Sequence, residues 1–534
     1  MRHDLLILFF ILLSSALMAD EHSNEAPSFK VQGIVTDEKG EGLPGASVWV
    51  KGTVVGAGTN AKGEFSFKLS SKNRCVLRVS FTGYEPQERE VTPGVDSLYH
   101  FVLEPSNNAL NEVVITGTRT LKPLKDVPVL TRVISSEDIA QVNPLDLQSL
   151  LEYEMPGLQF GLAHGSGLPE LKFQGSAGGY VLFMIDGERV AGEGSSNNID
   201  YNLIDMDNVE RIEIVKGPMS TLYGSQAMGG VVNIITKDAN RPFTGNVSVR
   251  YGNNDESKYS LSLGTKQGRF SALTSLSYRK RDAYALKDKE GQIEYSYYKD
   301  IYGRDSVVAD TSEKGMSSVN GFEIWQANQK LSYTFNENFR ISLNGTYYNN
   351  DVLEYVEQKE QDRFSNYSIN PRVYYAINDS HILDFSYVFE NYEKRYVYTT
   401  SLPSKKVFGD LTNTVRLNYT GYIHEKHTLT AGIEVNTQKL QHYWFDNGSG
   451  KKFDAQTYVL YLQEDYKVSD SFSVLAGVRS DCHSKYSFHA SPKISLMYKY
   501  GVLTLRGGYG MGFRIPSLKE LHSEYDMGGQ GFFM

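Results

Sequence analysis

Residues 428–435 read Thr-Leu-Thr-Ala-Gly-Ile-Glu-Val, and polar and apolar side chains alternate along them. Because successive side chains of a β-strand point to opposite faces, this segment predicts a strand with one polar and one apolar face. The same alternation recurs at 259–264, 339–344 and 415–420. Segments of roughly ten residues with this period, ending in aromatic residues and separated by polar turns, are typical of an outer-membrane β-barrel. We therefore expect the apolar faces to meet lipid and the polar faces to line the lumen.

The pattern continues through a region at 244–534, in which we count about thirteen candidate strands. Short connections at 252–257 and 336–338 contrast with long polar connections at 281–318 and 445–455. A barrel of this kind has short periplasmic turns and long extracellular loops. The two short connections are therefore expected at one end of the barrel and the two long ones at the other.

The composition fits a chain of this class. The 534 residues include 36 Tyr and 26 Phe, while the mean hydropathy is −0.38. Aromatic richness with a polar average is expected where strands show one face to lipid and one to water. The formal net charge of −9 argues against nucleic acid as the main partner. The two cysteines, Cys75 and Cys482, offer neither a disulfide framework nor a thiolate metal cluster.

The N-terminus has the features of a secretory signal. An apolar run at 5–13 follows Arg2 and His3, and small residues continue to Ala19. The run is shorter than the roughly 20 residues that cross a bilayer as a helix. We therefore expect residues 1–19 to be a signal peptide.

Residues 29–104 predict a small β-sandwich, because short β-rich runs are separated by Gly, Pro, Asp and Asn. The motifs GIVTDEKG at 33–40, PGASV at 44–48 and TNAKGEF at 59–65 follow one another in this part. Together they resemble the carboxypeptidase regulatory-like domain, a non-catalytic accessory sandwich.

Residues 121–240 show a different pattern. Ser135 and Ser136 are candidate N-caps of a helix, and 145–154 predict a second helix. Strands are expected at 180–187 and 209–216. The pattern predicts a small α+β domain.

Four motifs of this domain resemble the plug domain of TonB-dependent outer-membrane receptors. They are IDGERV at 185–190, VERIEIVKGP at 209–218, TLYGS at 221–225 and GGVVNIITK at 229–237. The preceding sandwich is similar to the N-terminal extension of such receptors in Bacteroidetes. The plug-motif residues, to which we assign a structural role, are Asp186, Gly187, Arg211, Glu213, Lys216, Gly217, Pro218, Tyr223, Gly224, Gly230 and Asn233.

The resemblance implies a mainly β fold in which a plug blocks a barrel of about 22 strands. A ligand would bind on the outside, and a TonB box in the linker at 105–120 would pair with TonB in the periplasm as an added strand. We expect this box to be an extended, unpaired segment. Implied partners are TonB with the inner-membrane ExbB/ExbD motor, outer-membrane lipid and a surface lipoprotein. The residues expected to form the box are Glu112, Val113, Val114, Ile115, Thr116 and Gly117.

About thirteen strands fall short of the roughly 22 that the family's barrel needs. An open barrel would expose unpaired strand edges to lipid. We therefore expect a truncated product or an incomplete sequence, which by itself does not form a working pore.

The expected function is TonB-dependent import of a scarce large nutrient, namely haem, a ferric siderophore or cobalamin. The segment GFRIPSLKEL at 512–521 resembles the FRAP box of haem receptors, with Ile515 in place of Ala. Imidazole is a common axial ligand of haem iron, so loop histidines are candidates for binding it. Neither a prosthetic group nor a resident metal is expected, since iron enters only as cargo. The candidate ligand-binding residues are His164, His522, Arg514 and Tyr525.

Other classes stay open beside this one. A glycan importer of the SusC type shares the sandwich, but it is longer and has a different plug motif. A surface receptor or adhesin without transport is a further alternative, against which the TonB box argues. An enzyme finds no support, because no HExxH, nucleophile elbow or Walker loop occurs in a fitting context.

Overall fold

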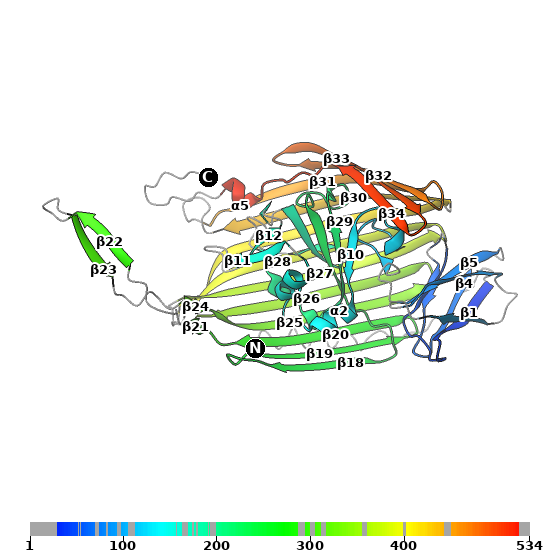
Figure 1. Ribbon diagram of the computed structural model, residues 1–534, viewed down its shortest axis with the longest axis horizontal. Coiled ribbons are helices and arrows are strands. Elements are labelled where there is room, and N and C mark those ends of the chain that lie inside the picture. Colours follow the sequence, from blue (N-terminus) through cyan, green and yellow to red (C-terminus); the bar gives the residue numbers. More distant parts are fainter. Residues whose placement is uncertain are drawn as a thin grey trace.

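Along the chain a sandwich comes first, then the predicted plug (called the plug below) and then one large sheet (Figure 1). The computed structural model describes residues 29–51, 53, 55–69, 74–81, 84–92, 98–104, 113–155, 157–162, 169–173, 176–177, 180–190, 192, 199–286, 294–299, 305–310, 317–354, 360–398, 402–424, 426–442 and 450–522.

The sandwich comprises β1 (Phe29–Asp37), β2 (Ser47–Val50), β3 (Gly56–Gly58), β4 (Glu64–Leu69), β5 (Cys75–Ser80), β6 (Gln87–Val91) and β7 (Tyr99–Leu103). One sheet has the order β4-β1-β7 and the other β3-β2-β5-β6. Fully buried apolar residues, among them Val31, Leu77 and Leu103, form the core between them. The predicted β-sandwich is confirmed.

The plug contains β8 (Val113–Val114), β9 (Lys122–Pro123), η2 (Leu124–Asp126), β10 (Thr131–Ile134), α2 (Ser136–Val142), α3 (Leu147–Glu154), β11 (Leu158–Leu162), β12 (Pro169–Phe173), β13 (Ser176–Ala177), β14 (Val181–Ile185), β15 (Glu188–Arg189), η4 (Tyr201–Leu203), η5 (Met206–Asn208), β16 (Val209–Lys216), α4 (Ser220–Tyr223) and β17 (Gly230–Thr236). Its central sheet has the order β10-β16-β17-β14-β15.

Local signals set the two longer helices of the plug. Ser135 is the N-cap of α2 and forms a capping box with Asp138, while Asp146 caps α3. Leu147 and Leu150 of α3 are fully buried in the same apolar cluster as Ile212 of the central sheet. The plug is thus the expected α+β unit with its own core.

The large sheet, called the wall below, consists of β18 (Thr244–Tyr251), β19 (Ser257–Gln267), β20 (Phe270–Arg281), β25 (Gly321–Asn336), β26 (Phe339–Leu353), β27 (Glu360–Asn378), β28 (His381–Tyr398), β29 (Lys405–His424), β30 (His427–His442), β31 (Lys452–Lys467), β32 (Phe472–His483), β33 (Ser487–Tyr500) and β34 (Leu503–Gly510). These 13 strands pair in chain order, as the sequence pattern predicts. Figure 1 shows the wall curving around the plug. The plug is bonded to strands at both edges of the wall, through Arg250 of β18 and Arg506 of β34.

β31 illustrates the alternation that defines the wall. Tyr458, Leu460 and Leu462 are 52%, 59% and 47% exposed, whereas Tyr461 and Gln463 between and beside them are 1% and 3% exposed. The outward side chains form the apolar face expected toward lipid, and the inward ones pack against the plug.

The two ends of the wall differ in the length of their connections. The expectation that the short connection after β18 lies at the end opposite to the long ones is wrong. The connection at 252–256 lies at the same end as the long one that follows β20, since Asp282 N donates to Asn254 O at 3.1 Å. The reason is that β18 runs from the short-turn end and reaches the long-loop end at Tyr251. The long connection itself carries β21 (Tyr284–Leu286), β22 (Glu294–Lys299), β23 (Asp305–Asp310) and β24 (Ser317–Val319), and β22 and β23 extend away from the wall (Figure 1).

The sandwich lies at the short-turn end. Lys68 N of β4 donates to the carboxylate of Glu337, in the turn between β25 and β26, at 3.0 Å. At the other end, β34 is followed by α5 (Leu518–His522). Within the described residues, no helix combines the length and the apolar character needed to cross a membrane.

Candidate functional site

The predicted TonB box is docked onto the plug. β8 pairs antiparallel with β9. The chain turns between these two strands, where Arg119 N donates to Ile115 O at 2.7 Å. Val114 and Thr116 are fully buried. The expectation of an unpaired segment is therefore wrong for Val113 and Val114 in this conformation, because docking buries apolar groups and satisfies backbone groups. Glu112 lies outside the described residues.

One buried carboxylate holds this segment. Glu213 accepts hydrogen bonds from Ile115 N at 3.0 Å, from Thr116 N at 2.8 Å and from Thr116 Oγ1 at 2.7 Å. Its charge is balanced by Arg211, whose guanidinium lies 2.8 Å away. A buried carboxylate is costly unless it is paired and hydrogen-bonded. Glu213 meets both conditions and so forms a stable anchor.

Two further side chains enclose Thr116. Glu213 and Asn233 lie opposite each other on β16 and β17, so their side chains reach the same residue. Asn233 Nδ2 donates to Thr116 Oγ1 at 2.9 Å, and Tyr223 OH donates to Thr116 O at 3.0 Å. Burial raises the pKa of Tyr223 to about 12, so its phenol remains a donor. We call Glu213, Asn233 and Tyr223 the Thr116 clamp.

The turn between β14 and β15 contacts the clamp. Gly187 N donates to Asn233 Oδ1 at 3.0 Å, and Arg189 donates to Tyr223 O at 2.7 Å. Asp186 accepts two hydrogen bonds from the last residue of β17. The φ angle of Gly187 is +84°, a conformation that glycine adopts without strain. The motif at 185–190 thus touches two of the three clamp residues.

The remaining plug-motif residues shape the chain around the clamp. Lys216 ends β16 and pairs with Gly230 at the start of β17. A Cβ at Gly230 would lie 2.5 Å from Val215 O, so a side chain there would collide with the backbone. The turns on either side of α4 contain Gly217, Pro218 and Gly224.

Residues that follow the box bind to β31. Arg119 donates to Tyr461 OH at 2.5 Å and lies 4.7 Å from the centre of that ring. Lys122 Nζ lies 2.6 Å from Asp465 Oδ2. Sequence reasoning missed these contacts, because the partners are more than 340 positions apart and no local signal links them.

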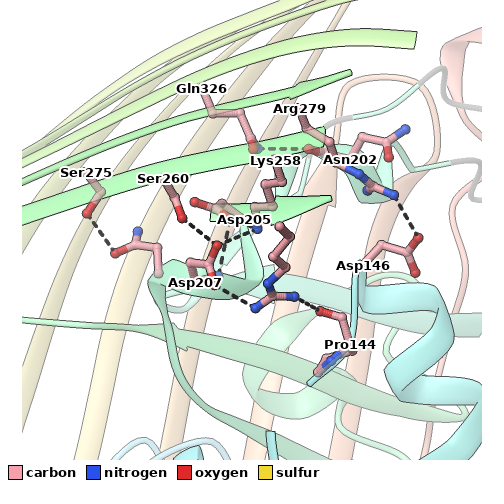
Figure 2. A network of polar contacts seen from close by, with 12 residues as sticks. Pro144, Asp146, Asn202, Asp205, Asp207, Lys258, Ser260, Ser275, Arg279 and Gln326 are labelled. Carbon is pink, nitrogen blue, oxygen red and sulfur yellow. Dashed lines mark hydrogen bonds and ion pairs between the residues drawn. The ribbon is translucent and has the colours of Figure 1, made fainter. Parts of the chain in front are cut away.

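A second set of contacts joins the plug to the early strands of the wall, as Figure 2 shows. Lys258 Nζ lies 2.6 Å from Asp205 Oδ1 and 2.8 Å from Asp207 Oδ2. Arg250 lies 3.0 Å from Asp207 Oδ1, and Ser260 donates to Asp207 Oδ2 at 2.6 Å. Burial acts to raise the pKa of Asp207, but Lys258 and Arg250 outweigh it and hold that pKa below its usual value. The other plug–wall pairs in this view are Pro144–Arg250, Asp146–Arg279, Asn202–Gln326 and Asn208–Ser275.

A third contact involves a buried plug carboxylate with little charge compensation. Asp200 is fully buried and accepts hydrogen bonds from Tyr348 OH at 2.7 Å and from Tyr392 OH at 3.2 Å. Burial raises the pKa of Asp200 to about 6, although these phenols and Asn202 N oppose the shift. A pKa in this range favours the neutral carboxyl in mildly acidic solution.

The predicted ligand-binding residues are only partly described. His164 and Tyr525 lie outside the described residues. His522 ends α5, and its ring stacks on Phe453 with centroids 3.7 Å apart. Burial, together with Lys485 and Lys451, lowers its pKa, which favours the neutral imidazole.

Arg514 lies in the FRIP segment just before α5. It forms an ion pair with Glu520 at 2.5 Å, and Glu520 also accepts from Ser517 N at 2.7 Å. The FRIP segment is therefore folded onto α5. In the part of the chain that the structure describes, no three His, Cys, Asp or Glu side chains gather to hold a metal ion.

Comparisons with known proteins agree with this architecture. A family model described as "TonB dependent receptor-like, beta-barrel" matches residues 250–533, which is more than half of the chain. The chain belongs to the TonB-dependent receptor family. Models of the TonB-dependent receptor plug domain and of the CarboxypepD_reg-like domain match residues 123–231 and 31–115 of the receptor. The predicted mainly β fold and the outer-membrane location are confirmed.

Individual relatives are similar in sequence at a modest level. The receptor is 26% identical over 426 residues to the vitamin B12 transporter BtuB of Vibrio vulnificus, covering 78% of this chain and 65% of the relative. It is 25% identical over 480 residues to the ferric enterobactin receptor of Pseudomonas aeruginosa, covering 78% and 62%. A crystal structure of a variant of the latter protein aligns with a TM-score of 0.61 at 20% identity, over 73% of this chain and 63% of that one. The chain thus spans less than two thirds of the length of these relatives.

Proposed function

We propose that this receptor imports a large, scarce nutrient across the outer membrane in a TonB-dependent process. The observation that carries the proposal is the docking of the predicted box onto a plug that is itself bonded to the wall. Import by such a device needs a segment that a periplasmic partner can grasp and a gate to which that segment is joined. Residues 113–117 and the central sheet of the plug provide both.

TonB is the proposed partner, and pairing would occur by strand addition. Val113, Val114 and Ile115 are β-branched, which favours an extended conformation once they leave the plug. The ExbB/ExbD motor would supply force through TonB, and the sandwich and the box would face the periplasm. A surface lipoprotein would be a further partner at the long-loop end.

The proposed cargo is cobalamin, a ferric siderophore or haem. The printed names of the relatives support the first two, since they are a vitamin B12 transporter and a ferric enterobactin receptor. Haem is supported by His522, which follows the FRIP segment and whose lowered pKa favours the neutral imidazole. Titration of the receptor with haem tests this last cargo. A Soret shift that is lost in His164→Ala and His522→Ala supports haem, and no shift at micromolar haem removes it.

Deletion of Val113–Ile115 tests the function itself. In cells that express the receptor with a closed barrel, we expect the deletion to leave binding of cobalamin or ferric siderophore intact and to abolish uptake of the cargo that binds. Deletion of Ser106–Asn108 is the matched control, because it shortens the same linker by the same length and spares the box. Uptake that survives the loss of Val113–Ile115 would refute the proposal.

A further inference from the structure

We propose that a cavity between the plug and the wall binds a monovalent cation such as Na⁺ or K⁺. The cavity has a volume of about 120 Å³ and is lined by the β14–β15 hairpin and by strands β20, β25, β26, β27 and β28. The contacts of Figure 2 form one margin of it, since Asp205, Ser275 and Gln326 also line the cavity. This volume is enough for an ion together with several waters. The proposal goes beyond the proposed function and does not depend on it.

The wall side of the cavity is rich in neutral oxygens that lack a hydrogen-bond partner. Within the described residues, the buried and unpartnered oxygens that line it belong to Ser277, Asn328, Asn344, Asn366 and Asn370. Buried polar atoms are normally satisfied, and leaving them without a partner is costly. A ligand that attracts oxygen lone pairs would therefore gain several contacts here at once.

The orientation of Asn366 is fixed by its neighbour Glu390. Asn366 is only 5% exposed, and its Nδ2 donates to the carboxylate of Glu390 at 3.0 Å. Because an ionised carboxylate can only accept, the amide nitrogen must face it. The amide oxygen of Asn366 is then the atom that remains without a partner. Since both residues line the cavity, this oxygen and the carboxylate of Glu390 can serve the same ligand.

Glu390 is the carboxylate of this cavity that no cation balances. Within the described residues it forms no ion pair and accepts its hydrogen bond from Asn366. Arg189 also lines the cavity but donates to Tyr223 O and Ser225 O instead. The other carboxylates of the described lining are each paired with a cation of the wall. These pairs are Asp186–Lys330, Glu188–Arg416 and Asp205–Lys258, at 3.3, 2.8 and 2.6 Å. One negative charge is thus left for a ligand to balance.

This set of ligands favours an ion of single charge. Sites for Ca²⁺ usually combine several carboxylates, and in the part of the chain that the structure describes no three His, Cys, Asp or Glu side chains gather to hold a metal ion. Neutral carbonyl oxygens replace the hydration shell of K⁺ in channel filters, and a carboxamide offers the same kind of oxygen. One carboxylate with several neutral oxygens therefore fits Na⁺ or K⁺ better than a divalent ion.

A cation in this cavity joins the plug to the wall. Glu390 belongs to β28, whereas Asp186 and Glu188 belong to the β14–β15 hairpin, and all of them line the same cavity. Carboxylates that face one another across an interface repel, and a cation between them reverses that effect. The hairpin therefore opens less readily while the ion is bound.

Hydrogen exchange of the amides of Asp186 and Gly187 tests the site, because both amides are hydrogen-bonded to β17. The purified receptor with a closed barrel is compared in NaCl, KCl and N-methyl-D-glucamine chloride at equal ionic strength, which keeps general screening constant. At about ten times its dissociation constant, a bound cation should slow exchange about tenfold relative to the bulky organic cation. The salt that protects at the lower concentration distinguishes Na⁺ from K⁺. Broadening of the sodium NMR signal by the receptor measures binding of Na⁺ directly.

Two substitutions assign the effect to this cavity. Glu390→Gln keeps the shape of the side chain and removes its charge, so the difference between the salts should disappear. Asn344→Leu removes one neutral oxygen and should raise the half-saturating concentration on the order of tenfold, as the loss of one contact to a charged group implies. Asp384→Asn is the matched control, because Asp384 lies on the same strand and the same face as Glu390 but outside the cavity lining. In this control the difference between the salts should persist.

Equal exchange in all the salts, without broadening of the sodium signal, would overturn the proposal and leave water as the content of the cavity. A salt effect that is the same in the wild type and in Glu390→Gln would also overturn it, since the cation then acts elsewhere. If Glu390→Gln does not fold, Asn344→Leu decides the question, because an unchanged half-saturating concentration contradicts the site. Deletion of Val113–Ile115 tests the proposed function separately, whatever the salts show.

Discussion

The plug is bonded to the early strands β18 and β19 of the wall and to its late strands β31, β33 and β34. We call these two attachments the early side and the late side, and they differ in kind. On the early side, Asp205 and Asp207 share Lys258, whose side chain is only 4% exposed. On the late side, Asp126 pairs with Lys499, and both side chains are more than a quarter exposed. Buried pairs that lose one partner are strongly destabilised, whereas exposed pairs contribute little. Of these two sets of ion pairs, the one around Lys258 is therefore the firmer, while Lys122 and Asp465 form a second late-side pair whose side chains are 22% and 8% exposed.

Chain connectivity reinforces this difference. The box precedes the late-side contacts by a few residues, while the early side is adjacent to the segment that enters β18. Force applied at the box therefore reaches Arg119 and Lys122 before it reaches Asp207. The comparison suggests a plug with one side that releases and one that stays.

Lys258→Met should lower the local opening free energy of the plug more than any of the other substitutions. A smaller effect would contradict the inference that the early side is the firmer one. It leaves Asp205 without this cation, and burial then opposes the charge of both carboxylates. We expect the opening free energy at η5 to fall by about 3–5 kcal/mol. Hydrogen exchange at Met206–Asn208 measures it, and Lys258→Arg is the control that retains charge. A loss of less than about 1 kcal/mol would mean that the early side is no firmer than the late side.

Asp200→Asn should give the next largest effect. This effect is a change in how the stability of the plug around Asp200 depends on pH. The pKa of Asp200 is raised to about 6 from a usual 3.8, so the native plug binds this proton more tightly than the unfolded chain does. The resulting stabilisation, up to about 3 kcal/mol, is complete below pH 4 and is lost as the pH rises through 6. Asp207 has the opposite sign, because its pKa is lowered and its contribution is lost at acid pH.

Hydrogen exchange at Tyr201–Leu203 between pH 4 and pH 7 measures the effect of Asp200. The wild-type segment should open more readily as the pH rises through 6. In Asp200→Asn, which has no titrating group at this position, that dependence should disappear. Persistence of the full dependence in the variant would assign it to another group.

Arg119→Ala should weaken the late side moderately. The guanidinium lies between the rings of Tyr223 and Tyr461, at 4.8 Å and 4.7 Å from their centres, and donates to one phenol. Loss of these contacts is expected to cost about 1–2 kcal/mol. Exchange of the backbone amides at 118–122 should accelerate while that of η5 stays unchanged. Equal acceleration on both sides would show that the two attachments are not independent.

Lys499→Met should give the smallest effect. Burial acts to raise the pKa of Asp126, but Lys499 outweighs it and keeps the carboxyl ionised. Because the pair is partly exposed, its loss should cost less than about 1 kcal/mol at the same amides. This variant is the counterpart of Lys258→Met, and the ratio of the two effects measures how unequal the attachments are. Equal effects would contradict the comparison.

Much of the fold was predictable because its signals are local. Alternation along 428–435 and its repeats predicted the wall strands, and Ser135 marked the start of α2. The expected strand at 209–216 is β16 with the same bounds. The position of the turn at 252–256 was not predictable from length, since a short connection occurs at either end of an antiparallel wall.

The candidate site was predictable in its parts but not in its assembly. The sequence motifs mark Glu213, Tyr223 and Asn233 as members of a plug, but no local pattern says that all three meet at Thr116. The assignment of residues 112–117 as the TonB box and of His164, His522, Arg514 and Tyr525 as ligand-binding residues remains a prediction. His164 and Tyr525 lie outside the described residues.

By itself, the amino-acid sequence determined the period of the strands, the caps of the helices and the motifs that place the chain in its family. These properties depend on neighbours within a few positions, so they can be read along the chain. The tertiary structure alone decided that the predicted box is buried, that Glu213 is its anchor and that the two sides of the plug are unequally held. Those features depend on which distant groups share a low-dielectric environment, as with Lys122 and Asp465, 343 positions apart.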